Sequence, residues 1–549
     1  MTGVASAPVA DRSEIRRVAH AAFGLDDLRP EQVEAIEASA QGRDVLVVWA
    51  TGSGKSAVYQ VAGAVRPGIT VVVSPLIALQ EDQLSGLDEA PNAPKAVALN
   101  SNRGVRARAE AWRRLREGEA TYVLLAPEQL ANDEVVADLA ELDIALLVID
   151  EAHCITSWGH DFRPDYLGIG AVAQRLGRPP IIALTATAST PVRTEIAERL
   201  GLTDPAVLLG DVDRPGIRLD VRRHQEDSGK RAAVLEEVVS LPGPGLVYVA
   251  TRRSAEEYAA QLAERNLRSR AYHAGLGRKE RAAVHEAFLD DELDVVVATS
   301  AFGMGIDKEN VRFVVHADIP DSVDAYYQEL GRAGRDGGAA QATLHYRPED
   351  LALRRYFATK NPDAAEFRSV VTAIQGGAKR KAELSEATGL SPRRVTALLA
   401  LLVDTASVRL NRTGAVLRRG VDPRTAAEAA MARAEERERI DRSRIDTMRE
   451  YAETRRCRRQ VLLGYFGQEV AEPCGHCDTC ADGSAYGPVA AEASDSPFAV
   501  DDHVTHREWG DGTVVSVEDD RMRVFFESEG YKVLSIEIVA AEGLLTPAG

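Results

Sequence analysis

Short apolar runs alternate with helix-length segments between about Asp44 and Leu344. The runs are rich in β-branched residues and lack alternating polar positions, as is typical of strands that are buried on both faces. Such strands form parallel sheets covered by helices, so the pattern predicts an α/β fold, and about 300 residues suit two such units better than one. The predicted strands are Val45–Trp49, Thr70–Ser74, Tyr122–Ala126, Leu146–Asp150, Ile181–Leu184, Leu246–Ala250, Val295–Ala298 and Arg312–His316.

The remainder of the chain follows other patterns. Two helix-length segments, Ala382–Thr388 and Ser391–Leu402, precede a hairpin-like pair of strands at Val408–Arg419, an order typical of a winged helix. Pro423–Phe466 is charged and is predicted to be helical with one break. The last stretch of about 50 residues alternates as short strands with turns, which predicts a small all-β barrel.

The net charge of −18 taken alone argues against a nucleic-acid-binding protein. Its distribution weakens that objection, because residues 481–549 carry a net charge of −10 whereas residues 376–420 carry +6. A basic segment can bind a polyanion locally. No apolar run approaches the roughly 20 residues that span a bilayer, and no secretory signal is visible, so we expect a cytoplasmic protein.

The loop Ala50–Ser56 (A-T-G-S-G-K-S) joins the first predicted strand to a helix. Trp49 replaces the first glycine of the usual phosphate-loop pattern, but the two remaining glycines allow a tight turn whose N–H groups face an anion. Lys55 can reach the β- and γ-phosphates, and Ser56 can bind Mg²⁺. The alternative is a glycine-rich turn without a nucleotide. The predicted nucleotide-binding residues of this loop are Thr51, Gly52, Ser53, Gly54, Lys55 and Ser56.

Two adjacent carboxylates, Asp150 and Glu151, follow another predicted strand about 100 residues later. Buried carboxylates are costly unless something uses them, and Mg²⁺ held by Asp150 with an attacking water polarised by Glu151 would use both. His153 joins them as a candidate catalytic residue.

Gln328, Arg332 and Arg335 form a third candidate group in the second α/β unit. Phosphoryl transfer needs positive charge at the γ-phosphate, which guanidinium groups supply in bidentate form. The alternative is a surface pair of arginines on a helix.

Four of the five cysteines, Cys457, Cys474, Cys477 and Cys480, crowd into 24 residues. Their short spacing suits a tetrahedral Zn²⁺ site, and four ligands leave no open position, so the predicted zinc is structural. His476 could compete as a ligand, but the four thiolates suffice.

In combination, the motifs resemble the ordered motifs of superfamily 2 helicases over roughly Phe23–Arg355. The loop Cys154–Tyr166 resembles the aromatic-rich loop of RecQ-type DNA helicases, and Cys457–Cys480 resembles the RecQ zinc-binding subdomain. The motifs are Phe23-Gly24 with Leu28–Gln32, Ala50–Ser56, Ser74–Leu79, Asp150–His153, Thr185–Ala188, Thr299–Asp307 and Gln328–Arg335.

The resemblance implies ATP-driven 3′ to 5′ translocation on single-stranded DNA and unwinding of duplex or branched DNA, in repair and recombination. It implies that Arg29 and Gln32 read the adenine, with Leu25 in place of the usual aromatic residue, and that Asp307 belongs to the nucleotide site. Arg332 and Arg335 would complete that site across the cleft between the lobes. An RNA helicase or remodelling ATPase of the same superfamily is the alternative, and a non-enzymatic DNA-binding adaptor is a weaker one.

DNA contacts are expected at two places. The polar, aromatic loop can stack on unpaired bases and sense the adjacent ATP site, although aromatic residues can also simply fill a core. The basic segment of the winged helix can contact phosphates, the alternative being a solvated basic face. The candidate DNA-binding residues are Trp158, His160, Phe162, Arg163, Arg393, Arg394 and Arg412.

The acidic barrel (Val504–Leu545) resembles the Tudor/SH3-like tail of some superfamily 1 repair helicases, which implies a transcription or repair protein as its partner. A flexible linker would let it sit away from the motor, so we expect its removal to leave ATPase activity nearly unchanged.

The complete prediction is a monomeric α/β protein with two RecA-like P-loop lobes. The predicted boundaries are 1–205 for the first lobe, 206–350 for the second lobe, 351–421 for the winged-helix-like domain, 422–482 for the helical zinc-binding subdomain, 483–498 for the linker and 499–549 for the barrel.

Overall fold

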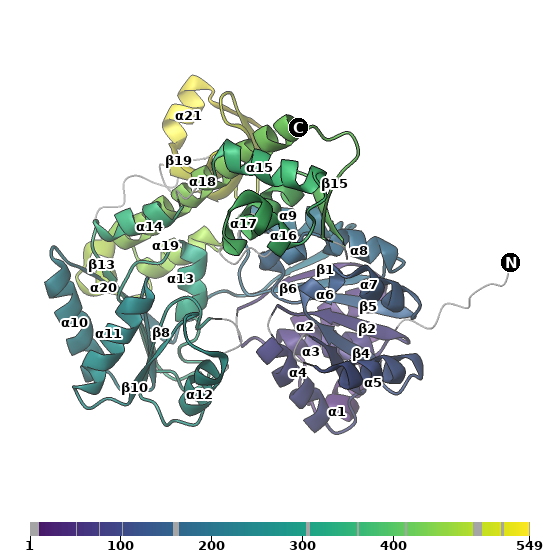
Figure 1. The fold of residues 1–549 in the computed structure, drawn as a ribbon. Helices are drawn as coiled ribbons and strands as arrows, with labels where there is room; N and C mark the ends of the chain where they lie inside the picture. Colours follow the sequence, from purple (N-terminus) through teal and green to yellow (C-terminus); the bar gives the residue numbers. More distant parts are fainter. Residues whose placement is uncertain are drawn as a thin grey trace. The chain divides into compact units, whose positions relative to one another are not determined.

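The fold is seen in a computed structural model that describes residues 10–50, 52–75, 77–100, 103–156, 164–303, 308–358, 362–411, 414–486, 497–517 and 521–547. The chain divides into two compact units (Figure 1). Unit 1 consists of Met1–Ala186, Val192–Asp211 and Pro362–Glu435, and unit 2 consists of Thr187–Pro191, Val212–Asn361 and Glu436–Gly549. Among the described residues, no helix is long and apolar enough to cross a membrane.

The centre of unit 1 is a seven-stranded parallel sheet in the order β3-β4-β2-β5-β6-β1-β7. Its inner strands β1, β2, β4 and β6 are buried along their whole length, which explains why they carry apolar residues without alternation. The strands are β1 (Val45–Val48), β2 (Ile69–Val73), β3 (Ala96–Leu99), β4 (Tyr122–Leu125), β5 (Ile144–Ile149), β6 (Ile181–Thr185) and β7 (Ala206–Leu209).

The edge strand β7 pairs with β1 in parallel, with Ala206 opposite Val45. The first sheet therefore continues past residue 205, where the sequence analysis ends the first lobe. Val207 and Leu209 are 46% and 53% exposed, so this edge strand is not buried on both faces although its four residues are all apolar.

Helices connect the strands of unit 1. The first of them is capped at its start by Asp11, whose carboxylate accepts hydrogen bonds from two backbone N–H groups, and at its end by Gly24 in the left-handed region. The helices are α1 (Arg12–Phe23), α2 (Pro30–Ala40), α3 (Lys55–Ala64), α4 (Ile77–Glu89), α5 (Val105–Arg116), α6 (Pro127–Leu130), α7 (Asp133–Ala140), α8 (Ile169–Arg175) and α9 (Thr190–Leu200).

Unit 1 also contains three helices and a two-stranded hairpin in the order expected of a winged helix. They share one apolar core with the first turns of α18 (Pro423–Glu453). The domain is joined to α9 by Asp404, which lies 3.0 Å from Arg199 and 2.7 Å from Arg433. The elements are α15 (Ala364–Gln375), α16 (Lys381–Thr388), α17 (Pro392–Asp404), β14 (Val408–Asn411) and β15 (Gly414–Leu417).

The centre of unit 2 is a six-stranded parallel sheet in the order β10-β11-β9-β12-β13-β8. All eight strands predicted from the sequence are thus present in the two sheets. The strands are β8 (Ile217–Arg223), β9 (Gly245–Tyr248), β10 (Ser269–Tyr272), β11 (Val295–Ala298), β12 (Phe313–His316) and β13 (Ala340–Tyr346). The helices are α10 (Asp227–Ser240), α11 (Arg252–Ala263), α12 (Arg278–Leu289), α13 (Val323–Leu330) and α14 (Asp350–Ala358).

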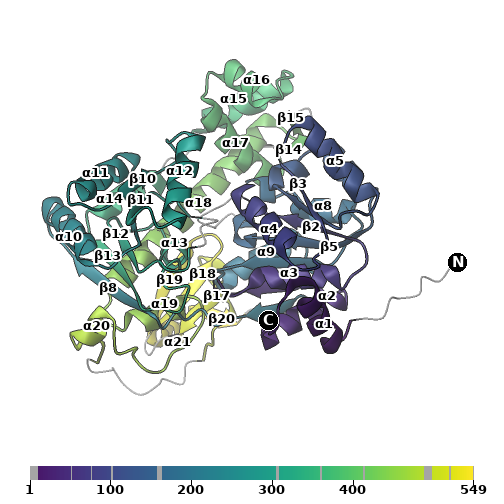
Figure 2. The same cartoon turned by 90° about the horizontal axis from the view of Figure 1, so that it is seen from below.

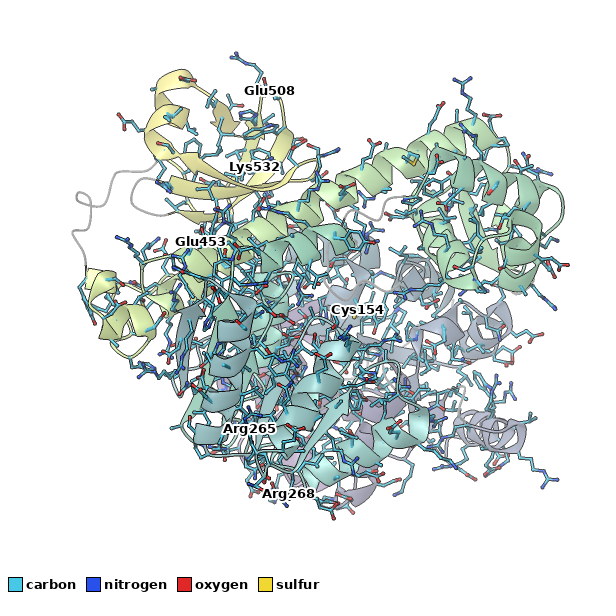
Figure 3. All side chains as sticks on the ribbon, turned by 60° about the vertical axis from the view of Figure 1, so that its left-hand side comes forward. Cys154, Arg265, Arg268, Glu453, Glu508 and Lys532 are labelled. Atoms are coloured by element: carbon cyan, nitrogen blue, oxygen red, sulfur yellow. The ribbon has the colours of Figure 1, made fainter. Side chains whose placement is uncertain are left out.

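The predicted broken helix is confirmed as α18 followed by α19 (Arg458–Tyr465), and α20 (Asp478–Ala481) comes next. Glu453, which is labelled in Figure 3, is the last residue of α18. It accepts a 2.7 Å hydrogen bond from the hydroxyl of Tyr346 on β13. The second parallel sheet and the zinc-binding region therefore belong to one unit.

The C-terminal domain, residues 497–547, is a five-stranded antiparallel sheet in the order β19-β18-β17-β16-β20, shown in yellow in Figure 2. The prediction of an all-β barrel is corrected in two respects. Residues that follow β19 form a helix, and no pairing of β19 with β20 closes the sheet among the described residues. The elements are β16 (His503–His506), β17 (Gly510–Val517), β18 (Arg521–Phe526), β19 (Gly530–Ser535), α21 (Ile536–Glu542) and β20 (Leu545–Pro547).

The C-terminal domain packs against α18, and its Tyr531 hydroxyl lies 3.1 Å from the hydroxyl of Ser189, so the expectation that it sits away from the motor is wrong. Arg523 donates a 2.8 Å hydrogen bond to Glu450, and the backbone N–H of Tyr531 donates one of 3.0 Å to the Ser443 hydroxyl. Gly530 adopts a φ of +75°, and a Cβ there would lie 2.1 Å from the Ser443 oxygen, so only glycine permits this close approach.

Candidate functional site: a nucleotide site and a four-cysteine cluster

The predicted phosphate loop lies between β1 and α3, at the carboxyl end of the parallel strand. Gly52 and Gly54 have φ values of +80° and +73°, which side-chain-bearing residues rarely adopt. The Lys55 ammonium group folds back over the loop and donates hydrogen bonds of 2.8 and 3.1 Å to the carbonyls of Trp49 and Ala50. The turn therefore holds a cation at the start of a helix, an arrangement suited to an anion.

Gln32 connects the segment before the first strand to this loop. Its side-chain oxygen accepts a 2.8 Å hydrogen bond from the Arg29 backbone, and its amide nitrogen donates one of 2.9 Å to the Gly54 carbonyl. Leu25 packs against the apolar core of unit 1, and Arg29 is exposed. The structure thus places Gln32 at the loop itself.

Asp150 and Glu151 stand at the carboxyl end of β5. Asp150 is only 8% exposed and accepts a 3.2 Å hydrogen bond from Gln83. Burial and the charge of Glu151 raise the pKa of Asp150 to about 7, although Lys55 acts in the opposite direction. A carboxyl group in such a place is suited to a cation that restores its charged form.

Glu151 has a φ of +49°, a conformation that is uncommon for a residue with a side chain and that often marks functional sites. His153 lies 3.3 Å from the Glu151 carboxylate and 3.0 Å from the Thr185 hydroxyl at the end of β6. The structure therefore gathers the predicted groups of unit 1 at one edge of the sheet, as parallel sheets do with ligand sites.

In unit 2, Gln328 lies on α13 and donates a 3.1 Å hydrogen bond to the Thr187 hydroxyl. Arg332 and Arg335 follow α13 directly, and Arg332 is 7% exposed. An arginine buried to that extent at the end of a helix is not the surface residue that the alternative interpretation required.

Arg214, which contacts the segment that carries Arg332 and Arg335, was missed in the sequence analysis. Its guanidinium group donates hydrogen bonds of 3.1, 2.8 and 3.3 Å to the carbonyls of Gly331, Ala333 and Gly334, so it supports the segment that carries Arg332 and Arg335. Arg459 of α19 in turn donates a 3.0 Å bond to the Arg214 carbonyl. The only local signal was the Pro215-Gly216 turn, which was interpreted as a boundary between lobes.

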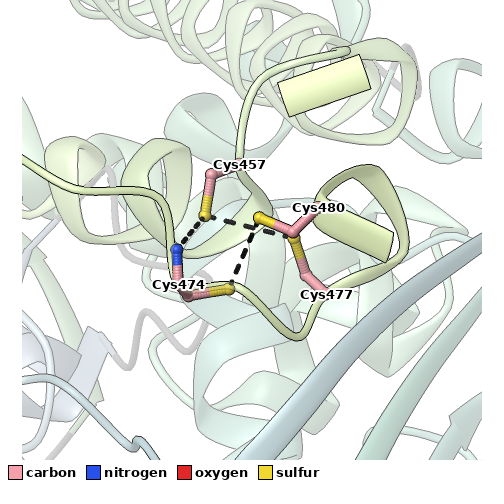
Figure 4. A group of neighbouring side chains, drawn as sticks. All are labelled: Cys457, Cys474, Cys477 and Cys480. Atoms are coloured by element: carbon pink, nitrogen blue, oxygen red, sulfur yellow. Dashed lines mark hydrogen bonds between the residues drawn. The ribbon is translucent and has the colours of Figure 1, made fainter. Parts of the chain in front are cut away.

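The four predicted zinc ligands converge on one point (Figure 4). All four Sγ atoms lie within 4.8 Å of one another, and both the Cys474–Cys480 and Cys457–Cys477 pairs are 4.0 Å apart. Sulfur atoms about 2.3 Å from a tetrahedral Zn²⁺ have nearly this spacing, so the donor set fits zinc. His476 instead contacts the Cys474 carbonyl at 2.9 Å, which agrees with four thiolate ligands.

Two of the predicted DNA-binding residues are described. Arg393 is exposed, whereas the Arg394 guanidinium group pairs with Glu366 at 2.6 Å within the winged helix. The predicted site residues that lie outside the described residues are Thr51, Trp158, His160, Phe162, Arg163, Asp307 and Arg412.

Comparison with protein families gives four matches along the chain. Residues 29–195 match the DEAD/DEAH box helicase family and residues 229–337 match the helicase conserved C-terminal domain. Residues 420–481 match the RecQ zinc-binding family, and residues 500–538 match the PcrA/UvrD tudor domain.

Individual proteins with similar sequences are also helicases. The chain is 34% identical over 466 residues to ATP-dependent DNA helicase RecQ of Pasteurella multocida, covering 85% of this chain and 62% of that protein. It is 32% identical to the RecQ helicase of Bacillus subtilis, covering 86% and 67% of the two chains. It is also 36% identical to the probable ATP-dependent DNA helicase RecS of B. subtilis, covering 66% and 73%.

Among solved structures, the DUF1998 helicase MrfA bound to DNA matches with a TM-score of 0.53 at 18% identity, over 76% of this chain and 64% of that chain, which shows a shared fold. The chain spans about 62% of the length of the first curated relatives that it matches. The ordered helicase domains, the zinc-binding region and the identity over most of the chain lead to one conclusion: the chain belongs to the RecQ family of ATP-dependent DNA helicases.

Proposed function

We propose that this protein hydrolyses ATP to move 3′ to 5′ along single-stranded DNA and to unwind duplex or branched DNA in repair and recombination. The observation that carries the proposal is the cluster of Lys55, Asp150 and Glu151 at the edge of the first sheet, in a chain of RecQ type. Its family membership supports DNA as the polymer, in preference to the RNA of other members of the superfamily.

The residues of unit 1 would bind and activate the nucleotide. Lys55 and the N–H groups of the loop hold the phosphates, and Ser56 with Asp150 would hold Mg²⁺, which supplies charge neutralisation at the β- and γ-phosphates. Glu151 accepts a proton from the attacking water, and His153 fixes the Glu151 carboxylate.

The residues of unit 2 would stabilise the transition state. Arg332 and Arg335 supply positive charge to the γ-phosphate as it is transferred. Arg335→Ala is then expected to bind ATP and DNA but to hydrolyse poorly, because it loses mainly transition-state charge. A normal kcat in that variant would move this role to Arg332.

The proposed DNA contacts lie in the loop that contains Trp158, His160, Phe162 and Arg163, and in the winged helix at Arg393 and Arg412. The match to a tudor domain supports a protein partner of the transcription or repair machinery for the C-terminal domain. We propose a monomeric, cytoplasmic protein associated with the nucleoid.

The test compares ATP hydrolysis with single-stranded DNA and with RNA, and strand displacement on 3′-tailed, 5′-tailed and forked DNA. We expect stimulation by DNA and displacement only where a 3′ tail is present, with Lys55→Ala as the inactive control. Equal stimulation by RNA would favour the RNA helicase alternative. Absence of any stimulated ATPase activity in the wild type would refute the proposal.

A further inference from the structure

A chain of three hydroxyl groups links the C-terminal domain to α13, the helix that carries Gln328. The Tyr531 hydroxyl lies 3.1 Å from the Ser189 hydroxyl and 3.2 Å from the Tyr465 hydroxyl. Tyr465, the last residue of α19, donates a 2.6 Å hydrogen bond to the Asp324 carboxylate in the first turn of α13.

The direction of these hydrogen bonds follows from the number of hydrogens. Each hydroxyl carries one, and burial raises the pKa of Tyr531 and Tyr465, so both keep it. With the Asp324 carboxylate as the final acceptor, all contacts are satisfied only if Ser189 donates to Tyr531 and Tyr531 donates to Tyr465. The hydroxyls of Tyr531 and Tyr465 then each donate one hydrogen bond and accept one.

Together with the hydrogen bond between Gln328 and Thr187, the chain of hydroxyls forms a closed ring of contacts. Asp324 and Gln328 are four residues apart on α13 and so lie on the same face. Ser189 is two residues from Thr187, which accepts the hydrogen bond from Gln328. The ring thus runs from Thr187 through Gln328, Asp324 and the two tyrosines to Ser189, and loss of one link loosens the others.

The residues that form this ring of hydrogen bonds are buried. Asp324, Tyr465 and Ser189 are at most 3% exposed, and the Tyr531 ring packs edge-on against Phe525 with ring centroids 5.0 Å apart. Arg444, which is also buried, lies 4.0 Å from the Asp324 carboxylate and balances its charge. Water can therefore not replace a missing hydroxyl freely.

We propose that Tyr531 is a positioning residue for ATP hydrolysis, whose hydroxyl holds the segment Thr187–Pro191 and α13 in the arrangement in which Thr187 and Gln328 pair. The C-terminal domain is then a working part of the motor as well as a surface for a partner. This inference rests on the proposed ATPase function for its kinetic part, and on the ring of contacts for its structural part.

Tyr531→Phe removes one hydroxyl but keeps the aromatic side chain, the backbone hydrogen bond to Ser443 and the Arg523–Glu450 pair. We therefore expect the C-terminal domain to stay docked. We expect kcat of the DNA-stimulated ATPase reaction to fall about fivefold, the effect of one buried hydrogen bond, with KM for ATP changed less than about twofold. Ser189→Ala is expected to cause the same loss, and the double variant no further loss, because both break the same ring. Tyr486→Phe, at a tyrosine that is 57% exposed, is the matched control and should keep wild-type kcat.

Hydrogen exchange measured on the full chain gives a readout that does not depend on activity. In Tyr531→Phe, the amides of residues 187–190 and of α13 should exchange several-fold faster than in the wild type, whereas Tyr486→Phe should leave them unchanged. Wild-type kcat or wild-type exchange in Tyr531→Phe would overturn the inference, as would losses that add fully in the double variant. An inactive wild type would instead contradict the proposed function, and the exchange of these amides would still decide the inference.

Discussion

Asp404 offers the sharpest test of how the winged helix is held in unit 1. It is the last residue of α17, where a negative charge opposes the helix dipole. Two cations offset this unfavourable interaction with the helix dipole, since Arg433 and Arg199 approach the carboxylate to 2.7 and 3.0 Å. Arg433 lies on α18 and Arg199 on α9, so one carboxylate joins three helices.

Asp404→Asn keeps the shape of the side chain but removes its charge. Removing one partner of a buried ion pair costs about 3–5 kcal/mol. The side chains of Arg199 and Arg433 remain 23% and 19% exposed, so water recovers part of this energy. We therefore expect the free energy of opening of α17 to fall by about 2–3 kcal/mol.

The stability lost in Asp404→Asn should depend on pH. Burial alone raises the pKa of Asp404, but the charges and hydrogen bonds of Arg433 and Arg199 outweigh it and hold the pKa below its ordinary value. Such a group stabilises the fold above its unfolded pKa of about 3.9, and this contribution is lost as the pH falls through the lower folded pKa. The difference between wild type and Asp404→Asn should accordingly be full at neutral pH and shrink below about pH 4.

Native-state hydrogen exchange of the α17 amides in the full chain measures this free energy directly. The control is Asp446→Asn, which breaks the exposed Arg355–Asp446 pair and should cost between about 0 and 1 kcal/mol. If Asp404→Asn destabilises α17 no more than this control does, the three-helix ion cluster does not hold the domain and the reasoning fails.

Lys55→Ala should lose ATP binding in a fluorescent-nucleotide titration, whereas Glu151→Gln should bind ATP and lose hydrolysis; substantial turnover in either variant would contradict the roles proposed for them. Arg214→Ala should lower kcat about tenfold or more, because three carbonyls of the arginine segment lose their donor, and Arg214→Lys should recover only part of it. An unchanged kcat in Arg214→Ala would show that the segment carrying Arg332 and Arg335 keeps its conformation without Arg214. Metal analysis should find one zinc per chain, and Cys477→Ser should lose both the metal and the protease resistance of residues 457–481, whereas a stable wild type without zinc would refute the assignment.

Eight strands of the two sheets could be predicted because strands that are buried on both faces carry continuous apolar residues. The four edge strands were missed, and so was the inner strand β13, whose apolar residues alternate with Gln341, Thr343 and His345. Ser269–Tyr272 carries polar residues and is partly exposed, whereas Ala206–Leu209 is a short apolar run that is exposed on one face. The phosphate loop, the Asp150–Glu151 pair and the cysteines were predictable because each is a short local pattern whose chemistry depends on spacing.

Contacts between distant segments left no such mark. Arg214 supports a segment more than 100 residues away, and nothing adjacent to it indicates this. The docking of the C-terminal domain depends on Gly530 and Tyr531 meeting Ser443 and Tyr465, residues that are individually unremarkable in sequence. A linker of suitable length and polarity predicted independence, whereas side chains on the two surfaces decided the outcome.

The helix α19 has a consequence for how this protein can vary in length. Its eight residues, about 12 Å of helix, begin directly after the zinc ligand Cys457 and end at Tyr465, with Arg459 between them facing Arg214. An insertion of one residue would advance the far end by about 1.5 Å and turn it by about 100°, so that Tyr465 would point away from Asp324 while the cysteines stayed in place. α19 therefore acts as a spacer of fixed length and phase. A zinc-binding region transplanted from a relative should serve this motor only if it preserves the number of residues between these two anchors.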